Sequence, residues 1–164
     1  MPQLGDFGLV KMSGDSGRLI RFGQWLNGDG FADYEHAFIY VGGNQIVEAM
    51  PNGAKLNSVH EHGNILWSTG WIGLTDAERK TIAQTALSLV GTPYSFADYA
   101  AIAAHTLHIP GNGLLKSYVA SSKHMICSQL VDYCYRQAGV SLFKDSRWPG
   151  YVTPASLYDL RPKT

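Results

Sequence analysis

The fold is decided by one stretch of the sequence, Glu35-His36-Ala37-Phe38-Ile39-Tyr40-Val41-Gly42-Gly43-Asn44-Gln45-Ile46-Val47-Glu48-Ala49. It contains two runs rich in β-branched and aromatic residues, Glu35–Val41 and Gln45–Ala49, and such residues favour strands. Between the runs lie two glycines and an asparagine, the residue types that tight hairpin turns require. We therefore predict two antiparallel strands joined by a short turn.

The length of this turn decides which side chains share a face of the hairpin. Every second residue of a strand points to the same side, so His36 shares a face with Phe38 and Tyr40. A two-residue loop pairs residue 39 with residue 48 and puts His36 and Glu48 on opposite faces. A three-residue loop, Gly42–Asn44, pairs residue 38 with residue 48 and makes His36 and Glu48 diagonal neighbours. A site that uses both side chains therefore predicts the three-residue loop with a glycine bulge.

Helices are predicted after the hairpin. Thr75 and Glu78 form a capping box, and the apolar stripe that follows them ends at Gly91 and Pro93. Similar patterns predict a helix over 96–107, a helix over 126–138 closed by Gly139, a short helix from Thr153 to Leu160, and an earlier short helix over 16–26. Because paired strands precede helices, the sequence predicts an α+β domain.

Composition limits the classes of partner. The 164 residues are 45% hydrophobic, which suits one domain spanning residues 1–164. A formal net charge of zero argues against nucleic acid or an anionic membrane surface as a partner. The sequence has no apolar run of roughly 20 residues and no basic start followed by an apolar stretch. We therefore expect no membrane span, no signal peptide and a cytoplasmic location as synthesised.

The chain has two cysteines, Cys127 and Cys134, within one predicted helix. Seven residues of helix rise about 10.5 Å, which exceeds the limit of about 7 Å between the Cα atoms of a disulfide, so we expect free thiols. Cys127 falls in the first turn, where the helix dipole favours a thiolate. Cys134 falls mid-helix and is expected to serve packing only. Packing as a small buried side chain is the alternative for Cys127.

Several segments together resemble a known family. Gly5-Asp6, His36–Gly42 and Val47-Glu48-Ala49 look like the strand block of NlpC-type, papain-like cell-wall cysteine peptidases. Gly91–Tyr94 and Ile126–Val131 look like that family's tyrosine segment and cysteine helix. The usual members have the cysteine helix first, so this chain resembles the circularly permuted branch that includes the YiiX-like proteins. Lecithin:retinol acyltransferase is a more distant permuted relative.

The resemblance implies a role for each matching residue. It implies that Cys127 is the nucleophile, that His36 is the general base and that Glu48 orients the histidine. It places Tyr94 beside the nucleophile, where the phenol and the backbone N–H of Cys127 would stabilise an oxyanion. Ser95 stands where family members often have an acid, so any role of that acid does not carry over.

The implied function is that of a papain-like thiol hydrolase that needs no cofactor. It would cleave an amide bond of a peptide or peptidoglycan fragment, with peptidoglycan stem peptides as the substrate class, through a cysteinyl thioester. Lipid acyl transfer or thioesterase chemistry is one alternative, and a non-catalytic binding module is another. A cell-wall substrate without an export signal implies carriage by a phage particle, holin-assisted release or recycling of wall peptides inside the cell.

A metal site is the remaining alternative from the residues. It would use His60-Glu61-His62, or His105 with His108. Neither group has the two histidines four residues apart that a zinc peptidase helix places around its glutamate. We therefore expect these histidines to be solvated loop residues, and we predict no metal.

Overall fold

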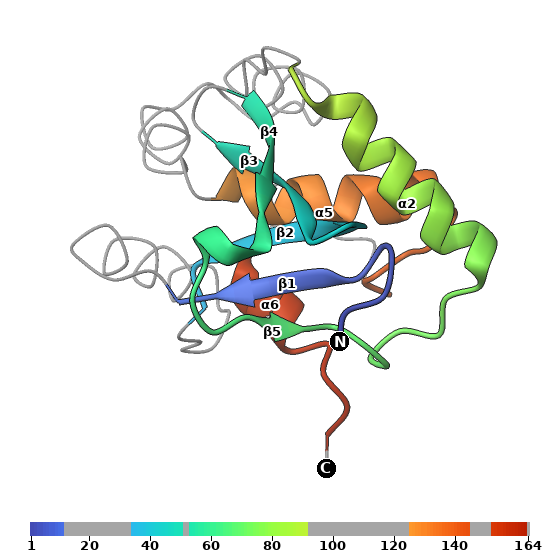
Figure 1. Cartoon of the computed structure of the whole chain (residues 1–164). Coiled ribbons are helices and arrows are strands. Elements are labelled where there is room, and N and C mark those ends of the chain that lie inside the picture. The colour runs from blue at the N-terminus through green and yellow to red at the C-terminus, as the bar shows by residue number, and fades with distance from the viewer. Residues whose placement is uncertain (12–33, 51–52, 92–124, 145–151, 164) are drawn as a thin grey trace, which may run out of the picture.

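The computed structural model describes residues 1–11, 34–50, 53–91, 125–144 and 152–163. These residues form an α+β arrangement, as predicted, with a five-stranded antiparallel sheet and three α-helices (Figure 1). The strands are β1 (Phe7–Val10), β2 (His36–Gly42), β3 (Gln45–Met50), β4 (Gly53–Ser58) and β5 (Leu66–Trp67), in the spatial order β4-β3-β2-β1-β5. The helices are α2 (Asp76–Leu89), α5 (Met125–Gln137) and α6 (Pro154–Tyr158), with a short 3₁₀ helix η1 (Val59–Glu61).

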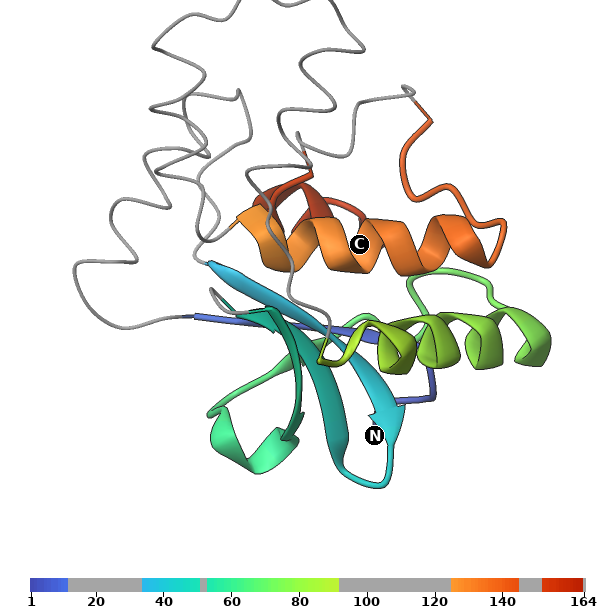
Figure 2. The same cartoon turned by 90° about the horizontal axis from the view of Figure 1, so that it is seen from above.

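Helices α2 and α5 lie side by side on one face of the sheet (Figure 2). The strand alternation puts Ala37 and Ile39 on this face, where they join the main core with Leu130 and Val131 of α5. The next residue along β2, Phe38, is also fully buried, but it belongs to a smaller cluster on the opposite face. The predicted division of β2 into two faces is therefore confirmed.

The hairpin has the predicted register but a different turn. Phe38 pairs with Glu48, as a three-residue loop requires. The loop itself has only two residues, Gly43 and Asn44, both with positive φ. The extra residue is Val41, which bulges out of β2 between two paired neighbours. The bulge supplies the one-residue shift that the predicted three-residue loop would have given.

The helix ends follow their capping residues. Thr75 and Glu78 form the predicted capping box at the start of α2. Helix α5 begins and ends one residue earlier than the predicted 126–138, and Gly139 follows it with φ 79°. Helix α6 is capped by Thr153, as predicted, and ends at Tyr158 rather than at Leu160. The predicted helices over 16–26 and 96–107 lie outside the described residues.

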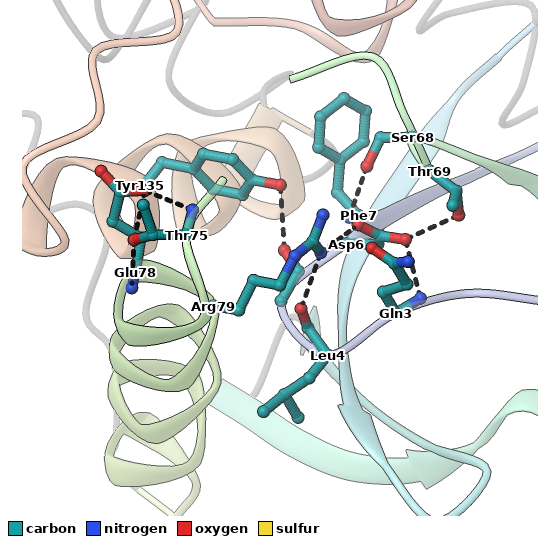
Figure 3. A network of polar contacts seen from close by, with 11 residues as sticks. Gln3, Leu4, Asp6, Phe7, Ser68, Thr69, Thr75, Glu78, Arg79 and Tyr135 are labelled. Carbon is teal, nitrogen blue, oxygen red and sulfur yellow. Dashed lines mark hydrogen bonds and ion pairs between the residues drawn. The ribbon is translucent and has the colours of Figure 1, made fainter. Parts of the chain in front are cut away.

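Asp6 is the centre of a polar network that joins β1 to both long helices (Figure 3). Its buried carboxylate accepts hydrogen bonds from the Gln3 N–H at 2.8 Å and from the Thr69 hydroxyl at 2.6 Å. Arg79 of α2 forms an ion pair with it at 2.8 Å. Beside it, the Tyr135 hydroxyl of α5 donates to the Gly5 carbonyl at 2.9 Å. These contacts fix how α2 and α5 sit on the sheet.

Within the described part of the chain, no helix has both the length and the apolar character needed to cross a membrane.

We predict that Asp6→Ala lowers the free energy of unfolding by about 3 to 5 kcal/mol, because it leaves the partly buried Arg79 guanidinium without its carboxylate. Denaturant unfolding monitored by circular dichroism measures the change. Asp159→Ala is the control, since the ion pair of this exposed residue with Arg161 spans 4.0 Å and its loss should cost less than about 1 kcal/mol. Equal losses in the two variants would show that the Asp6 network is not a stabilising centre.

Candidate active site

His36 is the first residue of β2, and its position there brings its ring to the start of α5. The residue is 8% exposed and pairs with Val10 of β1. Helix α5 packs on the opposite face of the sheet, but His36 lies where β2 begins, and its ring is within hydrogen-bonding reach of the Cys127 thiol. The structure therefore brings together the two residues for which the family resemblance implies the roles of base and nucleophile.

Glu48 lies on β3 and contacts the His36 ring at its Nε2 atom. Since it pairs directly with Phe38, it shares a face with His36 and is its diagonal neighbour. The His36 Nε2 atom is 2.5 Å from the Glu48 Oε2 atom. With Nε2 donating to the carboxylate, Nδ1 is the ring nitrogen left to face Cys127. One imidazole thus links a carboxylate to a thiol.

Two further side chains hold the Glu48 carboxylate. The Asn57 amide of β4 donates to Oε1. The His62 Nε2 atom, just after η1, is 3.1 Å from Oε2, the same oxygen that His36 contacts. Glu48 is 2% exposed, so these contacts replace the water that a buried carboxylate loses.

Cys127 lies in the first turn of α5, as predicted, and is 1% exposed. It packs in the main core beside Leu130 and Val131 of the same helix. The first turn of an α-helix is the positive end of its dipole, and Cys127 lies in that turn. The same thiol therefore belongs to the core and lies at the positive end of α5.

Cys127 and Glu48 together favour the charged form of His36. Burial lowers the pKa of His36, but the adjacent Cys127 and Glu48 outweigh burial and raise the pKa from 6.5 to about 10. Burial also acts on Glu48, where it raises the pKa, yet the hydrogen bonds from His36 and Asn57 lower the pKa to about 2. At neutral pH the carboxylate is therefore ionised and an imidazolium is stabilised between it and the sulfur.

Cys134 has a different environment, although both cysteines are free and buried. It lies two turns further along α5, and burial raises the pKa of its thiol to about 12. A thiol with this pKa is protonated at neutral pH and is a poor nucleophile. The expectation that Cys134 serves packing is consistent with this environment.

His36, Glu48 and His62 also have the donor types of a zinc site. Their ligand atoms lie within 4.8 Å of one another, and two imidazoles with a carboxylate can bind Zn²⁺. The contacts of 2.5 and 3.1 Å to Oε2 are, however, the distances of hydrogen bonds to one shared acceptor. Hydrogen bonding alone accounts for the position of each group.

The sequence reasoning missed Asn57 and His62. The expectation that His62 is a solvated loop residue is wrong, because it stacks on Phe38 and contacts Glu48. Its neighbour His60 is exposed, in agreement with that expectation. Two further residues singled out in the sequence, Tyr94 and Ser95, lie outside the described residues, as do the histidines at positions 105 and 108.

In comparisons with known proteins, no family model matches this chain, and no curated protein matches it. The resemblance to NlpC-type peptidases stays a prediction that rests on the order of the motifs.

The pKa shifts predict how the His36–Glu48 pair contributes to stability at different pH. Ionised Glu48 contributes above its ordinary pKa of 4.5, and the contribution is lost as the pH falls towards about 2. Protonated His36 contributes below its ordinary pKa of 6.5, and the contribution is lost as the pH rises through about 10. Both contributions are therefore complete between pH 4.5 and pH 6.5.

We expect the free energy of unfolding of the wild type, minus that of Glu48→Gln, to be largest in this window and to fall on both sides of it. Denaturant titrations at a series of pH values measure this difference. A difference that does not change with pH would contradict the coupled ionisation of the two side chains.

Proposed function

We propose that this chain is a thiol hydrolase in which Cys127 is the nucleophile, His36 is the general base and Glu48 orients the histidine. The single observation that carries the proposal is the continuous contact from Cys127 through the His36 ring to Glu48. Because the Glu48 carboxylate is at Nε2, Nδ1 is the ring nitrogen that can act as the base towards Cys127. A helix N-terminus beneath the sulfur adds to this support.

The geometry supports an acyl transfer to sulfur. His36 takes the thiol proton at Nδ1, and the Cys127 sulfur attacks the carbonyl carbon of the substrate. Collapse of the tetrahedral intermediate expels the amine, which receives its proton from His36, and leaves a thioester. Water then attacks the thioester with His36 again as base, which releases the acid and restores the thiol. Throughout, Glu48 stays ionised and stabilises the imidazolium.

The fold and the substrate class belong to the same proposal. We take residues 1–164 to be one circularly permuted papain-like domain of the NlpC type. The arrangement of the described residues is compatible with this, since a cysteine at the start of a helix meets a histidine at the start of a strand, and the histidine strand comes first in the chain. From the resemblance, we propose that the bond cleaved is an amide bond of a peptidoglycan stem peptide.

The first prediction is that iodoacetamide modifies Cys127 selectively at pH 6.5. About 1% of a free thiol is ionised at that pH. Pairing with His36 should therefore make Cys127 react at least about tenfold faster than free cysteine. Mass spectrometry of the digested protein locates the modified residue, and the rate measured over a range of pH values shows whether the thiolate persists below its usual range.

The His36→Ala variant should lose this fast reaction, while Cys134→Ala should keep it. Reaction of Cys127 only after unfolding would overturn the proposal and favour a binding module that kept the fold without turnover.

A second prediction concerns hydrolysis itself. Purified peptidoglycan incubated with the wild type should release new amino groups and shortened stem peptides, detected by mass spectrometry. Cys127→Ala should abolish this release, because no other described thiol contacts a base. Cys134→Ala is the matched control on the same helix and should retain activity. Activity that survives Cys127→Ala would exclude the mechanism. Fast alkylation of Cys127 without peptidoglycan cleavage would instead favour lipid esters or thioesters as the substrate class.

Glu48→Gln should reduce turnover by about tenfold or more without abolishing it, because the amide oxygen can still accept from the His36 ring but carries no charge. The comparison of kcat/KM with the wild type measures the effect. A variant with wild-type kcat/KM would remove Glu48 from the mechanism.

A further inference from the structure

His62 contacts the proposed catalytic carboxylate from the side opposite Asn57. Its Nε2 atom is 3.1 Å from Glu48 Oε2, and His36 reaches the same oxygen from β2. The side chain of His62 is 20% exposed, whereas that of Glu48 is 3% exposed, so a partly exposed imidazole contacts a buried carboxylate. The carboxylate is therefore enclosed by three donors from three segments of the chain.

The position of His62 is set by its own surroundings as well as by Glu48. Its ring stacks on Phe38 with a centroid distance of 4.9 Å and an interplanar angle of 20°. Its backbone N–H donates to the Val59 carbonyl at 3.3 Å, and Ser58 caps the 3₁₀ helix η1 that precedes it. Packing and the local turn thus present the imidazole to the carboxylate.

We propose that His62 is a positioning residue that holds the Glu48 carboxylate in the orientation needed by His36. This inference rests on the proposed function. A carboxylate has free rotation about its last bond, and only contacts on both oxygens fix its plane. Asn57 contacts Oε1 and His62 contacts Oε2, so each oxygen is held by a group other than His36. The effect on the sulfur passes through Glu48 and His36 and involves no contact of His62 with the substrate.

The inference requires one tautomer of His62. To donate to an ionised carboxylate, the ring must carry its proton on Nε2. Histidine ¹⁵N chemical shifts of the wild-type protein report this directly, and we expect a protonated Nε2 whose signal moves in Glu48→Gln. A ring protonated only on Nδ1 cannot donate to Oε2, and finding it would overturn the inference without any change at position 62.

Two substitutions separate the hydrogen bond from the packing. His62→Phe keeps an aromatic ring against Phe38 and removes the donor, whereas His62→Gln keeps an N–H donor and removes the stack. We expect His62→Phe to slow the alkylation of Cys127 by iodoacetamide at pH 6.5 by about tenfold. His62→Gln should restore most of the rate, and thermal unfolding of both variants checks the fold.

A control substitution and a double-mutant cycle test whether His62 acts through Glu48. His60→Ala changes an exposed histidine of η1, two residues before His62, and should leave the rate unchanged. In a Glu48→Gln background, His62→Phe should cause less than about twofold further loss, because the group that it positions is already altered. Additive losses would show that His62 acts by another route and would overturn the inference.

The outcomes distinguish this inference from the function on which it rests. A wild-type rate in His62→Phe, or equal losses in His62→Phe and His62→Gln, would reject the positioning role while His36-dependent alkylation of Cys127 still supports the hydrolase. If the wild type shows no His36-dependent alkylation, the proposed function and the positioning role both fail.

Discussion

The candidate site depends on the register between β2 and β3. Val41 bulges out of β2, and this one extra residue sets Phe38 opposite Glu48. Without it, residue 39 would pair with residue 48, and the glutamate would point to the face where Ile39 and Val47 now meet the helices. A carboxylate placed in that apolar core would lose its hydration without finding a partner. The bulge thus determines both the core and the meeting of His36 with Glu48.

The second determinant of the site is the placement of α5, which carries Cys127. The contacts that anchor this helix are remote from the thiol, since Tyr135 lies eight residues further on, about 12 Å along the axis. There it meets the Asp6 and Arg79 network at the start of β1. Because β1 and β2 are antiparallel, the network lies at one end of the sheet and His36 at the other. Helix α5 therefore connects the anchoring network with the end of the sheet where Cys127 and His36 meet.

Local patterns in the sequence predicted the elements that depend on local chemistry. The hairpin strands, the capping box of Thr75, the cap of Thr153 and the place of Cys127 in its helix all follow from neighbouring residues. Strands β1, β4 and β5 and the helix η1 were not predicted. Strand β5 has two residues and exists through pairing with β1, and β1 and β4 are placed by their pairing with β2 and β3. Asn57 and His62 were missed for the same reason, since their contacts with Glu48 depend on how β4 and η1 fold back over β3.

The free-energy cost of burying the polar side chains around Glu48 is relevant to their role. A buried ion pair is weak support for stability, because well-packed apolar residues of similar volume often stabilise a fold as much. Here a carboxylate, two imidazoles and an amide occupy one face of a small sheet, although the opposite face is packed with aliphatic side chains. The contacts of Glu48 with His36 and Asn57 favour its ionised form, and its charge lies beside the Nε2 atom of His36. The same ring is within hydrogen-bonding reach of a thiol at the start of a helix. This alignment is the one that the proposed nucleophile and base require.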